Sequence, residues 1–252
     1  MFKIIYQTLK AIFIILLTYS FVFAQKKDSV KHQEPLKATA NINVTNNGVS
    51  LFPNLSLGKP ATIINVSVGK KNIYFEPELR WGLSGKPWSY IYWLRFRPKR
   101  TEHFGFHIGA HPSYVIRENI VTINGKDETR YVSQRYVAAE AVPVWYHSPK
   151  FALGLHLLAS KGLDSYAIQK SYFMAIQPRF PNIGLNKNYY LSFFPQIFHL
   201  ILDNKKGTYF SESLSLNKQN CPLGISSMFT YKINSTIPGD NIVWNVGLNI
   251  KL

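Results

Sequence analysis

Apolar and polar residues alternate strictly along much of this chain, most clearly at its end. From Ile242 onward the even positions are apolar, and after Val243 the odd positions are polar or glycine. A period of two is typical of a β-strand with one face in an apolar medium and the other in water. The segment matches the roughly 9–11 residues that a tilted strand needs to cross a bilayer. Its apolar face consists of Trp244, Val246, Leu248, Ile250 and Leu252.

A strand at the end of a chain exposes an edge, so it must pair with an earlier strand and close the sheet. Alternation recurs in earlier segments, and no helix-period segment separates them. We therefore predict an all-β fold, a closed antiparallel transmembrane β-barrel of about 12 strands over residues 38–252. The other expected strands are 38–46, 61–69, 72–81, 88–97, 103–111, 130–146, 151–160, 169–180, 188–202, 208–216 and 223–233.

Some positions interrupt the alternation. We expect a bulge around residues 138–141, and another at Pro195, because proline cannot donate to the ladder. Residues 48–60 and 113–129 are predicted to be the longest outer loops, the second containing an Asn-Gly turn that suits a small hairpin. The aromatic face of residues 88–96 favours a lipid-facing wall, although a soluble exported β-sandwich is the alternative fold.

The N-terminus predicts export. Lys3 and Lys10 precede the apolar run 11–22, and a small-residue cleavage pattern ends at Ala24. Residues 1–24 are therefore expected to be a signal peptide, and residues 25–37 a flexible periplasmic lead. No later segment approaches 18 uninterrupted apolar residues, as a spanning helix would require. The predicted location is the cell outer membrane.

The charge balance is strongly basic, with 29 Lys+Arg against 13 Asp+Glu and a formal net charge of +16. For an exported protein this indicates contact with lipid phosphate, anionic sugars or small anions, and not with nucleic acid. Basic turns at the two barrel rims would explain the same excess. Cys221 is the only cysteine, so no internal disulfide is possible.

Charged residues alternate with the aromatic face of the hairpin at residues 72–97. On adjacent antiparallel strands, opposite side chains lie about 5 Å apart, so acidic and basic residues can pair inside the barrel. Such pairs would either fill a narrow lumen or form a constriction in which arginine favours anions. The candidate lumen residues are Glu76, Glu78, Arg80, Arg95, Arg97, His103, His107, His111 and Arg179.

Three of these candidates are histidines spaced four apart on one strand, His103, His107 and His111. Residues with that spacing lie about 13 Å apart, too far to reach one metal ion. We predict no metal site and no cofactor; a site joining one of them to His156 has no further support. The common hydrolase, metalloprotease and phosphate-loop motifs do not occur, so catalysis rests only on pairing His147 or His199 with a nearby serine.

Glu-Pro-Glu-Leu-Arg-Trp at residues 76–81, Gly-Lys-Pro-Trp at residues 85–88 and the alternating terminal strand resemble uncharacterised porin-like outer-membrane β-barrels of Bacteroidota. The match is one of residue identity within that hairpin and of alternating pattern over most of the remaining mature chain. The resemblance implies the β-barrel fold and the outer-membrane location, and it transfers no catalytic residue. Such families usually end in an aromatic or apolar residue read by the barrel assembly machinery, and here the last residue is Leu252.

The sequence therefore favours a narrow porin-like passive channel for small solutes, with anions among them. A lipid-modifying enzyme and a structural or adhesive barrel without an open pore are the alternatives. The expected partners are outer-membrane lipids and, during insertion, the assembly machinery. The pattern indicates neither the solute nor the oligomeric state.

Overall fold

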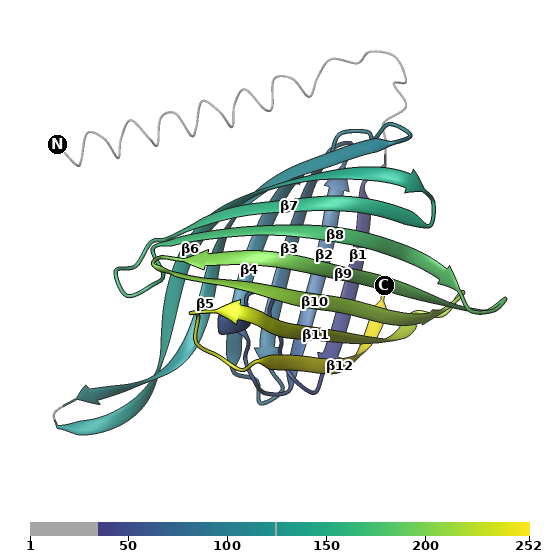
Figure 1. Cartoon of the computed structure of the whole chain (residues 1–252). Coiled ribbons are helices and arrows are strands. Elements are labelled where there is room, and N and C mark those ends of the chain that lie inside the picture. The colour runs from purple at the N-terminus through teal and green to yellow at the C-terminus, as the bar shows by residue number, and fades with distance from the viewer. Residues whose placement is uncertain (1–34, 124) are drawn as a thin grey trace, which may run out of the picture. The chain divides into compact units, whose positions relative to one another are not determined.

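The computed structural model describes residues 35–123 and 125–252, which form one closed antiparallel β-barrel of twelve strands (Figure 1). The predicted fold class is confirmed. Residues 1–34, with the expected signal peptide and most of the lead, lie outside the described residues. The strands are β1 (Lys37–Thr45), β2 (Ala61–Lys70), β3 (Ile73–Gly82), β4 (Pro87–Phe96), β5 (Phe104–Ile123), β6 (Lys126–Ser148), β7 (Phe151–Gly162), β8 (Lys170–Gly184), β9 (Tyr189–Leu202), β10 (Lys205–Lys218), β11 (Leu223–Ser235) and β12 (Ile242–Lys251).

Each strand pairs with its neighbours in sequence, and β12 returns to β1 to close the sheet. The seam runs from Asn41↔Lys251 to Thr45↔Gly247, and Ala40 and Leu252 exchange two further backbone hydrogen bonds. The apolar positions of the terminal strand point outward from this seam, where Trp244 and Leu248 are about half exposed. Within the described part of the chain, no helix is long and apolar enough to cross a membrane.

The wall follows the period of two. Outward residues such as Leu94, Ile176 and Ile197 are more than half exposed, whereas the inward residues Ala175 and Leu200 are almost completely buried. A soluble protein does not leave such a continuous apolar belt uncovered. The belt is what a barrel surrounded by lipid requires.

β5 and β6 are much longer than their neighbours, and together they extend beyond the end of the barrel (Figure 1). Their pairing continues without a register shift from Phe104↔Trp145 to Ile123↔Lys126. The small hairpin expected near residue 124 is thus a continuation of the two strands, and the prediction that residues 113–129 form a loop was wrong. The unbroken pairing also excludes the bulge expected at residues 138–141.

The bulge expected at Pro195 is also absent, since β9 pairs with β10 in one register along its whole length. The nearby irregularity lies in β8, between Phe180 and Ile183. Phe198, Leu200 and Leu202, which a bulge at Pro195 would have turned to the outside, therefore face inward. They belong to a buried apolar cluster with Phe173, Ala175, Tyr209 and Ile237.

That cluster fills the lumen at the end of the barrel where β12 begins. The β1–β2 connection covers it. The connection contains the short 3-10 helix η2 (Pro53–Leu55) and was expected to be an outer loop. It does not extend away from the rim but folds into the barrel: Leu51 and Phe52 pack on the apolar cluster, and Leu55 packs on Val115 and Tyr136. We call residues 46–60 the inward loop.

Polar contacts hold the inward loop in place. Arg117 Nη2 donates to Asn54 O at 2.6 Å, and its Nη1 donates to Ser56 O at 3.2 Å. Trp88 Nε1 donates to Leu55 O at 2.9 Å, so Trp88, expected on the lipid face, points inward. The shift occurs where the β3–β4 register slips between Arg80 and Trp81. These three bonds satisfy carbonyl groups that a short 3-10 turn leaves free.

Replacing Arg117 should loosen the inward loop without unfolding the barrel. Arg117→Ala removes two charge-assisted hydrogen bonds, worth about 1.5–3 kcal/mol each. We expect the amide of Leu57, which donates to Gly48 O, to exchange with deuterium at least tenfold faster, while strand amides keep their protection. Arg130→Ala is the matched control, because Arg130 pairs with Glu128 on the exposed hairpin. Equal exchange in both variants would contradict the anchoring role.

Candidate functional site

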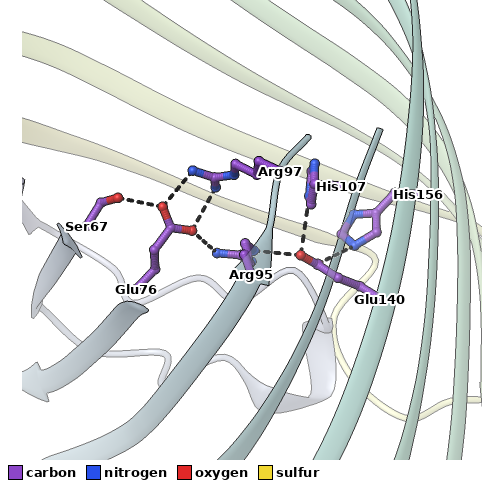
Figure 2. A network of polar contacts seen from close by, with 7 residues as sticks. All are labelled: Ser67, Glu76, Arg95, Arg97, His107, Glu140 and His156. Atoms are coloured by element: carbon purple, nitrogen blue, oxygen red, sulfur yellow. Dashed lines mark hydrogen bonds and ion pairs between the residues drawn. The ribbon is translucent and has the colours of Figure 1, made fainter. Parts of the chain in front are cut away.

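Seven inward side chains form a continuous polar network in the lumen: six come from the strands β2 to β7, one from each, and Arg97 follows β4 directly (Figure 2). At its centre Arg95 bridges two carboxylates: its Nη1 lies 2.7 Å from Glu76 Oε2, and its Nε lies 2.6 Å from Glu140 Oε1. Arg97 binds Glu76 through both terminal nitrogens, at 2.8 and 2.7 Å. We call this set the charged network; its members are Ser67, Glu76, Arg95, Arg97, His107, Glu140 and His156.

The register of the sheet explains how Arg95 reaches two strands away. Arg95 on β4 lies opposite Gly109 on β5, which lies opposite Glu140 on β6. A Cβ atom on Gly109 would come within 2.9 Å of Arg95 Cγ and 3.2 Å of Glu140 Oε1. The glycine therefore leaves the space through which the guanidinium crosses β5.

Glu140 is the most buried carboxylate of the network, with its side chain 2% exposed. Besides Arg95, it is approached by His156 Nε2 at 3.0 Å and by His107 Nε2 at 3.3 Å. Glu76 also accepts a hydrogen bond from Ser67 Oγ at 2.6 Å. Buried carboxylates are stable only when their oxygens are paired in this way.

The sequence did not single out Glu140, because three small alanines around it blur the parity of the strand. The signal was present nevertheless, since Glu140 shares parity with the inward residues Tyr136, Val142 and Val144. Arg117 and the inward loop were missed as well. Their contacts join segments that lie far apart in sequence, which alternation does not report.

The structure distributes the predicted lumen candidates over several places. Glu76, Arg95, Arg97 and His107 join the charged network. Glu78 and Arg80 form a separate ion pair on β3. His111 packs edge-on against Trp93, with the ring centroids 4.1 Å apart.

The two remaining candidates lie outside the network. His103 is exposed in the turn before β5. Arg179 points inward from β8 and donates to Gln177 Oε1 at 2.8 Å. Among the described residues it forms no ion pair, so its charge is not neutralised.

On the outer wall, His199 Nδ1 lies 2.9 Å from Thr208 Oγ1, a threonine hydroxyl where the enzyme hypothesis required serine. His147 packs between Trp145 and Phe151. In residues 35–123 and 125–252, no group of acidic, histidine or cysteine side chains is arranged to hold a metal ion.

Among the described residues, several lumen cavities border the inward loop; one of about 300 Å³ lies between Leu51 and Arg179, and two others differ in their lining. One, of about 250 Å³, lies between the loop and the wall that carries Glu78, Arg80, Trp93 and Glu140. The other, of about 380 Å³, is lined mainly by asparagine and serine side chains. We call the asparagine and serine side chains with inward parity around it the amide wall; they are Asn41, Asn43, Asn65, Ser213, Ser215, Asn217, Ser226, Asn245 and Asn249.

The inward-facing charges of the strands do not balance. Three carboxylates, Glu76, Glu78 and Glu140, pair with Arg80, Arg95 and Arg97. Among the described residues, further inward cations lie outside these pairs, including Arg117 on the loop carbonyls, Arg179 near Gln177, and Lys251, whose Nζ donates to Asn217 Oδ1 at 2.6 Å. The lumen is therefore net positive, and its excess charge lies outside the network.

No protein-family model matches this sequence, and no curated protein sequence matches it. Among solved structures, an outer-membrane channel from Pseudomonas putida F1 has a TM-score of 0.51 at 11% identity, covering 90% of this chain and 99% of the channel. At that identity the similarity bears on the fold alone, and it agrees with the fold of outer-membrane barrels.

Two other solved barrels are similar at a lower level. The KdgM porin, in complex with disordered oligogalacturonate, gives a TM-score of 0.49 at 7% identity over 84% of this chain and 98% of the porin. A loop deletion mutant of OmpT, an outer membrane protein of Vibrio cholerae, gives a TM-score of 0.48 at 6% identity over 86% of this chain and 99% of the mutant chain.

Neutralising Glu140 should destabilise the barrel. Glu140→Gln leaves Arg95 with one carboxylate instead of two in a buried position, and breaking such a pair costs about 3–5 kcal/mol. We expect a lower urea midpoint for unfolding from lipid vesicles. Glu128→Gln is the control, because its pair with Arg130 is about half exposed and contributes about 0–1 kcal/mol. Equal midpoints would show that the network does not stabilise the fold.

Proposed function

We propose that this protein is a narrow passive channel of the outer membrane for small solutes, with a preference for anions. The observation that carries the proposal is a closed barrel with a polar, net positive lumen that one inward loop narrows. Barrels of this size either fill with side chains or leave a narrow passage. Here the apolar cluster fills part of the lumen, and the cavities beside the inward loop belong to the space that remains.

The membrane location rests on the outer surface. Its apolar belt would be unstable in water, and a closed barrel leaves no backbone edge unpaired in lipid. Because the number of strands is even, the start of β1 and the end of β12 lie at the same rim of the barrel. We assign this rim to the periplasm. The long β5–β6 hairpin and the inward loop then belong to the opposite, outer side.

The anion preference comes from different residues than the sequence suggested. Arg95 and Arg97 lie in the lumen, but Glu76 and Glu140 neutralise them. Among the described residues, Lys251 and Arg179 contact amide oxygens and, for Lys251, the ring of Tyr190, but no carboxylate, so a passing anion meets their full charge. Rings of such cations are the usual source of anion selectivity in pores.

Purified protein in a planar bilayer should give discrete current steps. Replacing residues 49–57 with a short Gly-Ser linker removes the loop from the lumen, so we expect the step size to rise at least about twofold, as a wider barrel lumen conducts more. Shortening the β5–β6 hairpin at residues 119–130 is the control, since it lies beyond the barrel. Silence from correctly inserted wild-type protein would rule out an open pore.

The selectivity should depend on the cations without acidic partners. In water, a unit charge about 4 Å from a passing ion changes the free energy of that ion by about 1 kcal/mol. We therefore expect the chloride-to-potassium permeability ratio of R179Q/K251Q to fall about fivefold or more, measured as the reversal potential in a salt gradient. The control E76Q/R95Q removes one charge of each sign and should leave the ratio nearly unchanged. A larger effect in the control would place the selectivity in the charged network instead.

A further inference from the structure

The amide wall differs from the rest of the lumen. It is formed by inward residues of β1, β2, β10, β11 and β12, the strands on both sides of the seam. Of the residues around its cavity of about 380 Å³, only Glu78 and Lys251 are charged, and none is aromatic. The wall thus offers neutral groups that both donate and accept hydrogen bonds.

The amides of this wall are held in fixed orientations. Asn43 Nδ2 donates to Asn249 Oδ1 at 2.5 Å and to Ser226 Oγ at 2.9 Å, which connects β1, β12 and β11. Asn217 and Asn249 are less than a tenth exposed. Side chains that are packed and hydrogen-bonded in this way lose little freedom when a ligand binds.

Glycines make room for these amides. A Cβ atom on Gly247 would lie 2.5 Å from Asn43 Oδ1, and one on Gly224 would lie 2.9 Å from Asn217 Oδ1. Larger residues would therefore displace the two asparagines. The Oδ1 atom of Asn43 is also buried without a partner among the described residues, and a buried acceptor without a donor is unfavourable.

The spacing of the wall suits a ligand with many hydroxyl groups. Inward residues of one strand lie about 7 Å apart and those of neighbouring strands about 5 Å apart, so several amides can reach one small ring. A small ion gains little from neutral amides, and an aromatic ligand finds no stacking partner around this cavity. A neutral molecule that donates and accepts at closely spaced positions matches the wall best.

We infer that the amide wall binds a neutral sugar or short oligosaccharide and guides it through the lumen. This inference rests on the proposed channel, and it names a neutral solute class in addition to the anions that the lumen cations favour. The alternative is that the asparagines and serines only pack against one another and close the seam.

The test is block of the ion current by maltotriose in a planar bilayer, with a polyethylene glycol of matched mass as the neutral control. We expect maltotriose to interrupt the current at millimolar concentrations, and the half-blocking concentration to rise at least tenfold in Asn43→Leu. Asn119→Leu, on the exposed hairpin, is the matched control and should behave like the wild type. Ser226→Ala and Asn249→Ala are milder changes that keep the test valid if Asn43→Leu does not fold.

If the protein conducts ions and maltotriose and the glycol block the current equally, the sugar site would be overturned. The proposed channel would be unaffected by that result. Saturation-transfer NMR with maltotriose on protein in micelles requires no pore. The wild type could give no current and still show sugar contacts by NMR that are lost in Asn43→Leu. That result would support the sugar site and overturn the channel. Absence of sugar contacts in NMR would overturn the sugar site.

Discussion

The pairing of β1 with β12 is the constraint on which the rest of this structure depends. In lipid there is no water to satisfy a free strand edge, so the first and last strands must find each other across more than 200 residues of chain. The seam is short, with five register pairs from Asn41↔Lys251 to Thr45↔Gly247. Side chains reinforce it from inside, because Asn43 bonds Asn249 across it. Closing the sheet also defines the lumen in which every other polar contact lies.

The sequence was sufficient for the strands because the signal for a lipid-facing wall is local. A strand that alternates between two media repeats its pattern every two residues, and all twelve segments could be found in that way. The method failed where both faces are apolar. In β9, inward Phe198 and Leu200 alternate with outward Ile197 and Ile201, and the resulting run was misread as a bulge at Pro195. The method also missed Glu140, because the small alanines beside it blur the alternation of β6.

The lumen was less predictable because its contacts are made between distant segments. Arg95 was expected to pair across its hairpin, and it does contact Glu76, but its second partner depends on Gly109 leaving space over β5. Nothing in the spacing of residues 46–60 shows that they turn inward onto Phe173 and Trp88. Such contacts follow from closure, so they can be derived only when the register of the whole sheet is known. The positions of the unpaired cations follow from the same register.

The length of the β5–β6 hairpin has an electrostatic consequence. From Arg117 to the turn at Gly125 the pair extends about eight residues, or roughly 26 Å at about 3.3 Å per residue. At physiological ionic strength the Debye length is about 8 Å, so the tip lies about three screening lengths from the loop anchor. Charges next to the tip, such as Lys126, therefore contribute little to the potential at the loop anchor, whereas Arg130, opposite Asn119, lies within about one Debye length of Arg117. The charge of the hairpin tip could therefore change in evolution with little effect on the electrostatic potential inside the barrel.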